Sequence, residues 1–63
     1  MTVGKRIQQL RNEIPLSQKE LANRLSIGSS TLACYETDRR QVPHEVLIAL
    51  AKLFEVSTDY LLG

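Results

Sequence analysis

Apolar residues recur at helical spacing through the first part of this chain, with polar residues between them. Val3, Ile7 and Leu10 are separated by four and three positions, the spacing of residues on one face of an α-helix. Pro15 disfavours helical geometry at the residue before it, so this first helix is predicted to end near residue 12 or 13.

Residues 18–36 contain two shorter helical patterns around a tight break. They predict one helix over residues 18–25 and another over residues 29–36. Ala22 lies at the centre of the first of these helices, where a small side chain lets a second helix approach closely. Two helices with such a short connection and a small residue at their crossing form a helix-turn-helix.

Two further helices are predicted, from about Glu45 to Phe54 and from Thr58 to Leu62. The first of them should be the most buried element, because its apolar face is wide. That face consists of Val46, Leu47, Leu50, Ala51, Leu53 and Phe54. The chain is therefore expected to be one all-α domain of five short helices over residues 1–63.

Capping residues precede several of these helices. Thr2 and Ser57 are suitable N-caps for the first and last helices, and Ser17 with Glu20 has the spacing of a capping box. Gly28 precedes the second helix of the helix-turn-helix and is an acceptable cap without a side-chain acceptor.

The composition limits the class of protein. A chain of 63 residues with 43% hydrophobic content allows one domain with a modest core. The single cysteine excludes an internal disulfide and a metal site of paired Cys and His residues. No apolar run approaches the roughly 20 residues that span a membrane, and no signal-peptide core begins the chain, so a cytoplasmic protein is expected.

The formal net charge is only +1, which is modest for a nucleic-acid-binding domain. The acids Glu45, Glu55 and Asp59 collect in the last third of the chain. Most of the basic residues lie nearer the helix-turn-helix: Lys5, Arg6, Arg11, Lys19, Arg24, Arg39 and Arg40. A mildly dipolar domain is expected, with its basic end near the helix-turn-helix.

Several segments occur in the order of a known family. KRIQQLR precedes the helix-turn-helix, LSQKELA opens it, Pro43 follows it, and LIALAKLFEVSTDYLLG completes the chain. Together they resemble the Cro/C1 and xenobiotic-response-element type domains of bacterial and phage repressors, over about residues 3–63. The resemblance implies a lambda-repressor-like fold, no cofactor, and sequence-specific binding of double-stranded DNA as a transcriptional regulator, most simply a repressor.

At three positions where the family usually has glycine, this chain has another residue. Pro15 predicts an extended, rigid connection between the first two helices. Ser26 would adopt a left-handed backbone at a cost of about 1 kcal/mol, unless the turn differs from that of the family. Asp38 can also visit the left-handed region.

In the family, the second helix of the helix-turn-helix enters the major groove and its first residues meet base edges. Carried onto this chain, four outward residues would contact bases: Ser29, Ser30, Ala33 and Cys34. None is an Arg, Lys, Asn or Gln that could make a bidentate base contact. Ala33 could touch a thymine methyl group, and further specificity would come from DNA shape and water. Alternatively, the two serines are only polar residues at a helix start.

The resemblance also implies contacts to backbone phosphates. Gln18 resembles the family residue that binds phosphate with its side chain and with the exposed amide at a helix N-terminus. The phosphate candidates are Ser17, Gln18, Thr31, Thr37, Arg39 and Arg40. The alternative for Gln18 and for the two arginines is an ordinary solvated position.

Arg11 and Glu36 match two family positions that often form an ion pair between the first helix and the recognition helix. A structural role is expected for this pair. Cys34 could suggest a redox sensor, but no cation is near it in sequence and it lies past the middle of its helix. A plain thiol is therefore favoured.

One module of this size makes few contacts, so two copies are expected on a palindromic operator with half-sites roughly 34–36 Å apart. The expected homodimer surface is the C-terminal end, with apolar residues among Phe54, Val56, Leu61 and Leu62. The alternative is a protein-interaction module of the same fold that recruits or inhibits a partner without binding DNA. The near-neutral charge favours this alternative, whereas Gln18 and the arginine pair favour DNA.

Catalysis is not expected. The chain has one histidine, His44, and neither a Gly-rich phosphate loop nor a carboxylate pair at useful spacing. His44 follows Pro43 and most simply begins the fourth helix.

Overall fold

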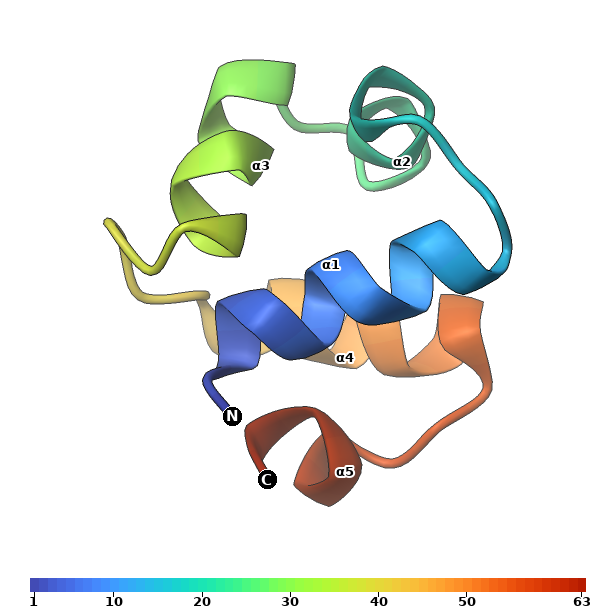
Figure 1. Cartoon of the computed structure of the whole chain (residues 1–63), viewed down its shortest axis with the longest axis vertical. Coiled ribbons are helices and arrows are strands. Elements are labelled where there is room, and N and C mark those ends of the chain that lie inside the picture. The colour runs from blue at the N-terminus through green and yellow to red at the C-terminus, as the bar shows by residue number, and fades with distance from the viewer.

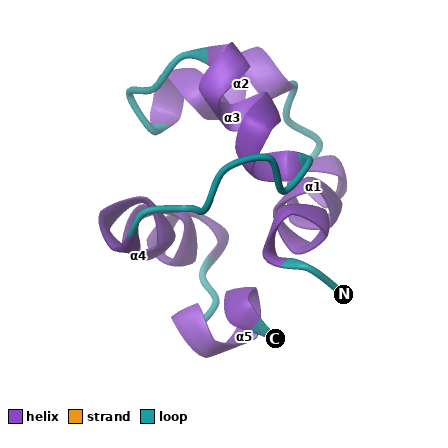
Figure 2. Cartoon of the chain, turned by 90° about the vertical axis from the view of Figure 1, so that its left-hand side faces the viewer, coloured by secondary structure: helices purple, strands orange, loops and turns teal.

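Five α-helices and their short connections form the computed structural model, which describes all residues from 1 to 63. The helices are α1 (Val3–Glu13), α2 (Gln18–Arg24), α3 (Ser29–Glu36), α4 (His44–Phe54) and α5 (Thr58–Leu62). In two perpendicular views, α2 and α3 lie together at one end of the molecule and α5 lies at the other (Figures 1 and 2). The predicted all-α fold of five helices is confirmed.

The predicted helix boundaries agree with the structure to within a residue. α2 ends at Arg24 with Leu25 as its C-cap, and α4 begins at His44, one residue earlier than expected. Thr2 and Ser57 are N-caps, and each side chain accepts a hydrogen bond from a backbone N–H in the first turn. Local sequence signals therefore determine where most of these helices start.

The core receives one fully buried large side chain from each helix. Ile7, Leu21, Leu32, Leu50 and Leu61 are each no more than 1% exposed. The expectation that Leu61 belongs to an exposed dimer surface is therefore wrong. α5 is a short amphipathic helix that covers the core with Leu61. The next residue, Leu62, is 54% exposed.

The expected extended connection between α1 and α2 is also wrong, because this connection is a turn. Ile14 keeps a helical backbone (φ −77°, ψ −20°) in spite of the proline that follows it. The backbone N–H of Leu16 donates to the Arg11 carbonyl at 2.9 Å, and the Leu16 side chain is buried. This hydrogen bond and the burial of Leu16 outweigh the preference of a pre-proline residue for extended backbone.

Three residues other than glycine have left-handed backbones, and each lies at the end of a helix. The sequence left this conformation open for Ser26 (φ 58°) and Asp38 (φ 60°), whereas for Glu55 (φ 57°) it was not considered. Glu55 is the C-cap of α4, and its N–H donates to the Lys52 carbonyl at 3.4 Å. Each left-handed residue costs about 1–2 kcal/mol, which the surrounding packing must offset.

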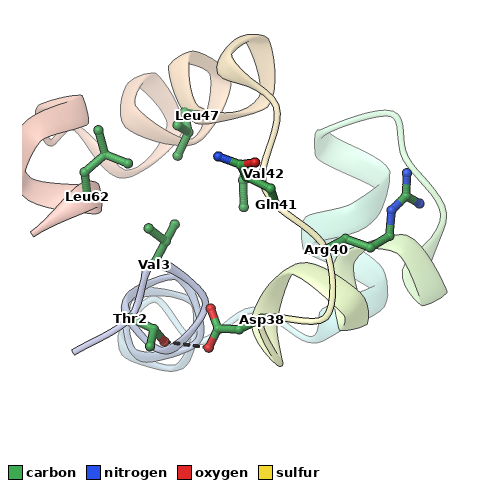
Figure 3. Close-up of a pocket in the computed structure, with 8 residues that line it drawn as sticks. All are labelled: Thr2, Val3, Asp38, Arg40, Gln41, Val42, Leu47 and Leu62. Carbon is green, nitrogen blue, oxygen red and sulfur yellow. Dashed lines mark hydrogen bonds between the residues drawn. The ribbon is translucent and has the colours of Figure 1, made fainter.

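The end of α3 is tied to the start of α1 through Asp38. One Asp38 carboxylate oxygen accepts a hydrogen bond from the Thr2 hydroxyl at 2.6 Å, and the other accepts from the Gly4 N–H at 3.1 Å. Figure 3 shows the Thr2–Asp38 contact at the edge of a cavity of about 410 Å³. The carboxylate therefore binds two otherwise unpaired donors at the beginning of α1.

A second contact joins α1 to α5. The Arg6 guanidinium lies over the Tyr60 ring, 4.3 Å from its centroid. Tyr60 is 44% exposed, so we assign this cation–π contact about 0.5–1 kcal/mol. The contact was not anticipated from the sequence, because it joins residues that are far apart along the chain.

Gly4→Ala is expected to reduce the free energy of unfolding by about 3 kcal/mol, near the upper end of the usual cost of overpacking. A Cβ at Gly4 would overlap the Tyr35 carbonyl oxygen and lie 2.7 Å from the Glu36 carbonyl oxygen and from an Asp38 carboxylate oxygen. Urea denaturation followed by circular dichroism measures the change.

Gly28→Ser is the matched control, because a Cβ there would have no neighbour closer than 3.8 Å. This variant should raise the free energy of unfolding by a few tenths of a kcal/mol, because the serine hydroxyl supplies the side-chain acceptor that the N-cap of α3 lacks. Equal effects of the two substitutions would contradict the close approach of α1 to α3.

Candidate nucleic-acid interface

The two helices of the helix-turn-helix pack against each other, and Ala22 in α2 is buried, with 1% of its surface exposed. The Ala22 carbonyl accepts a hydrogen bond from the Ile27 N–H at 3.0 Å, and the Ser26 N–H donates to Asn23 at 3.1 Å. These hydrogen bonds lie in the turn that joins α2 to α3. A larger side chain at position 22 would separate the helices.

α3 has a buried inner face and an uncovered outer face. Leu32 and Tyr35 are buried in the core, as expected. Ser29 and Ser30 at the start of the helix are exposed, and the other two candidate base-contact residues, Ala33 and Cys34, are half-buried. The structure thus places all four candidates away from the core side of α3.

A shallow hollow of about 370 Å³ lies beside this outer face of α3. It is lined by Ser30, Ala33, Cys34, Thr37 and Arg39. The structure therefore brings three candidate base-contact residues together with two candidate phosphate-contact residues. Ser29 does not line the hollow.

The start of α2 has the predicted capping box. The Ser17 hydroxyl accepts from the Glu20 N–H, and the Glu20 carboxylate accepts from the Ser17 N–H, both at 3.0 Å. The hydrogen bond from the Ser17 backbone, followed by that from its hydroxyl, lowers the pKa of Glu20 below its ordinary value. The backbone N–H groups of Gln18 and Lys19 lie in the same first turn, where a helix has no acceptor for them.

The Gln18 side chain has a partner that the sequence did not reveal. Its Nε2 donates a hydrogen bond to Glu36 Oε1 at 3.1 Å, and the side chain is half-buried. This contact leaves the second N–H of the amide and the backbone N–H for a further acceptor. Gln18 is therefore held in place by the end of α3 rather than extended freely into solvent.

The expected ion pair between Arg11 and Glu36 is present. Arg11 Nε lies 2.7 Å from Glu36 Oε2, and Nη2 donates to Oε1 at 3.2 Å. The remaining guanidinium nitrogen, Nη1, donates to the Leu16 carbonyl at 3.0 Å. The Glu36 side chain is 1% exposed, so its buried charge is paired with Arg11 and its Oε1 also accepts a hydrogen bond from Gln18.

The two arginines after α3 line different surfaces. Their backbone N–H groups both donate to the Cys34 carbonyl, at 2.9 Å from Arg39 and 3.3 Å from Arg40. Arg39 lines the hollow beside α3. Arg40 borders the cavity near the start of α1, but its side chain is directed away from the other lining residues (Figure 3). Of the two candidate phosphate-contact threonines, Thr37 is exposed and Thr31 is half-buried.

Sequence reasoning also missed the contacts of Gly4 and Asp38. A glycine inside a predicted amphipathic helix was the available signal, because such a residue often marks a close approach of another backbone. Its partner could not be identified from spacing alone, since Asp38 lies 34 residues further along the chain.

The structure contains no group of three or more His, Cys, Asp and Glu residues that could hold a metal ion. His44 is exposed in the first turn of α4. None of the five helices has the length and apolar character needed to cross a membrane.

The family model of a helix-turn-helix domain matches residues 4–63, so the chain belongs to this family. It is 44% identical over 63 residues to the HTH-type transcriptional regulator ImmR of Bacillus subtilis, covering 100% of this chain and 50% of that protein. It is 40% identical over 58 residues to the regulator RamB of Mycobacterium tuberculosis, covering 92% of this chain and 12% of RamB. The chain thus spans half the length of ImmR and a small part of RamB.

Solved structures agree with this assignment. The P22 c2 repressor in complex with a synthetic operator has a TM-score of 0.92 and 27% identity, covering 100% of this chain and 96% of that chain. The biofilm regulator SinR in complex with DNA has a TM-score of 0.87 and 30% identity, covering 98% of this chain and 100% of that chain. The predicted Cro/C1-type, lambda-repressor-like fold is confirmed.

Arg11→Met is expected to reduce the free energy of unfolding by about 3–5 kcal/mol, because it leaves the Glu36 carboxylate buried without its cation. The double variant Arg11→Met/Glu36→Met should lose less free energy of unfolding than the two single variants lose in sum. Urea denaturation of the four proteins in this cycle measures the coupling.

Arg24→Met is the matched control, because Arg24 is exposed at the end of α2. This substitution should change the free energy of unfolding by less than about 0.5 kcal/mol. A loss below about 1 kcal/mol for Arg11→Met would mean that the pair behaves as an exposed salt bridge.

Proposed function

We propose that this domain binds double-stranded DNA sequence-specifically as a transcriptional regulator, with α3 in the major groove. The observation that supports this function best is the outer face of α3, which bears small side chains that are exposed or half-buried: Ser29, Ser30, Ala33 and Cys34. The operator and DNA complexes of the P22 c2 repressor and SinR support the same use of a closely similar fold.

The major groove is about 12 Å wide and admits one helix. The small residues of α3 would let its backbone lie deep in the groove, with Ser29, Ser30, Ala33 and Cys34 meeting base edges. None of these side chains is long enough to reach a base from a distance. The depth of the helix in the groove therefore becomes critical for recognition.

The phosphate contacts would flank the groove. At the start of α2, the free N–H groups of Gln18 and Lys19 and the positive end of the helix dipole favour an anion. Gln18 would add the second N–H of its amide while the first remains on Glu36. The other proposed phosphate contacts are Ser17, Thr31, Thr37, Arg39 and Arg40.

We propose a homodimer on a palindromic operator, joined through the C-terminal end. Phe54 and Val56 are half-buried and Leu62 is 54% exposed, so each offers apolar surface there. Ile48 in α4 and Tyr60 in α5 are also partly exposed, at 37% and 44%. Such a regulator would act in the cytoplasm on bacterial or phage operators. We propose no catalytic activity for it.

The second candidate is a protein-interaction module that never binds DNA. The net charge of +1 and the exposed Ile48 and Leu62 favour it. Salt dependence separates the two functions. DNA binding weakens with a log–log slope of about −0.9 per phosphate neutralised, whereas an apolar protein interface responds little to salt.

Selection of randomised duplexes by the purified protein is expected to recover a two-fold symmetric motif with half-sites one helical turn apart. Sequencing the retained duplexes at low and moderate salt gives the motif and its salt dependence together. Weak retention without a motif would mean that residues outside this chain supply dimerisation. No retention at low salt would favour the protein-interaction module.

Leu62→Ser is expected to weaken paired binding to the palindrome while changing the free energy of unfolding by less than about 0.5 kcal/mol. Leu61→Ser should instead cost about 2–5 kcal/mol, because that side chain fills the core. Band-shift titration of one-half-site and two-half-site duplexes, together with urea denaturation, measures both effects. Unchanged paired binding by the folded Leu62→Ser protein would argue against this dimer surface.

A further inference from the structure

We propose that the cavity beside the Thr2–Asp38 contact binds a small organic cation with an apolar body, such as an alkylammonium ion. The cavity has a volume of about 410 Å³ and is lined by residues of α1, the α3–α4 loop, α4 and α5. Small-molecule sites have volumes of roughly 300–1,000 Å³ and are mostly apolar with a few polar groups. The proposal does not depend on DNA binding, because none of the candidate base-contact residues lines this cavity.

Half of the residues that line the cavity are apolar. Leu47 of α4 is 7% exposed and Leu62 of α5 is 54% exposed, while Val3 and Val42 are half-buried. In Figure 3 the side chains of Val3, Val42 and Leu47 are directed toward one shared space. A hydrocarbon body in this space would remove their remaining surface from water, which favours binding.

Asp38 places a carboxylate at the edge of this apolar space. Its two oxygens accept hydrogen bonds from the Thr2 hydroxyl at 2.6 Å and from the Gly4 N–H at 3.1 Å. Both donors are neutral, and the only salt bridge of the structure joins Arg11 to Glu36, so no cation of the chain pairs with this carboxylate. Each carboxylate oxygen keeps further acceptor capacity for a ligand.

The one basic residue that borders the cavity does not face it, because the Arg40 side chain is directed away from the other lining residues (Figure 3). The remaining polar residue, Gln41, contributes a neutral amide. An anionic ligand would therefore meet the Asp38 carboxylate without a compensating charge. An ammonium group would instead form a charge-assisted hydrogen bond with it, so the carboxylate and the apolar residues together favour an apolar cation.

The test titrates the isotope-labelled protein with hexylammonium, 1-hexanol and hexanoate, and follows the backbone amide signals by NMR. Saturable shifts should centre on the residues that line the cavity. Hexylammonium should bind about threefold more tightly than 1-hexanol, the advantage expected of a solvent-exposed ion pair, and hexanoate should bind most weakly. Shortening the chain to pentylammonium and butylammonium should weaken binding by about fourfold for each CH₂ group removed.

A pair of variants tests the charge. Asp38→Asn keeps an acceptor oxygen and a side chain that tolerates the left-handed backbone at this position, but it removes the negative charge. The ratio of hexylammonium to 1-hexanol affinity should fall to about one in this protein. Asp59→Asn makes the same change at an exposed position of α5 that does not line the cavity, and it should keep the threefold ratio.

A second pair tests the apolar lining, so the result does not rely on the Asp38→Asn protein being folded. Val42→Thr replaces one methyl group at the cavity by a hydroxyl and should weaken hexylammonium and 1-hexanol alike, by about fourfold. Val46→Thr makes the same change at a half-buried position of α4 that does not line the cavity, and it should leave both affinities unchanged. Circular dichroism checks that each variant remains helical.

Three results would overturn the cation site. Amide shifts that never saturate, or that spread evenly over the surface, would mean that the ligands bind without a site. Hexanoate binding as tightly as hexylammonium would remove the role of Asp38. Cavity signals that change with protein concentration, and that hexylammonium fails to shift, would mean that a second copy of the chain covers the cavity.

Discussion

The rest of the structure depends on the buried contact between Arg11 and Glu36. The guanidinium holds both carboxylate oxygens and the Leu16 carbonyl, and Gln18 adds an amide to the same carboxylate. One cluster therefore joins α1, the turn after it, the start of α2 and the end of α3. A buried carboxylate without its partners destabilises a small domain severely. The contact of Glu36 with its partners therefore fixes these elements relative to one another.

The fixed points of α3 lie at its C-terminal end. Glu36 is held by α1 and α2, and Asp38, just beyond the helix, is held by Thr2 and Gly4. The N-terminal end of α3 has no side-chain cap, and its first residues are exposed. A helix anchored in this way can present its first turn to a partner at a constant angle, because its anchors lie at the opposite end of the helix.

Local chemistry made much of this fold predictable. The serine caps, the helical spacing of apolar residues and the arginine–glutamate pair are each readable from neighbouring positions or from the family pattern. The failures concern choices that depend on distant parts of the chain. Whether Leu61 or Leu62 faces inward depends on where α5 meets the core, and the turn at Pro15 depends on the burial of Leu16. In the candidate site, spacing showed that Gln18 lies at a helix start, but its contact with Glu36 required the angle between α2 and α3.

The small side chains of α3 and the low net charge both bear on the ratio of specific to non-specific DNA binding. A strongly basic domain binds any duplex through phosphates, and its base readers must then overcome a large non-specific background. For a DNA-binding domain with a net charge of +1, that background would be weaker. Modest base contacts can then still produce a useful ratio of specific to non-specific binding, provided that two domains act together on one site.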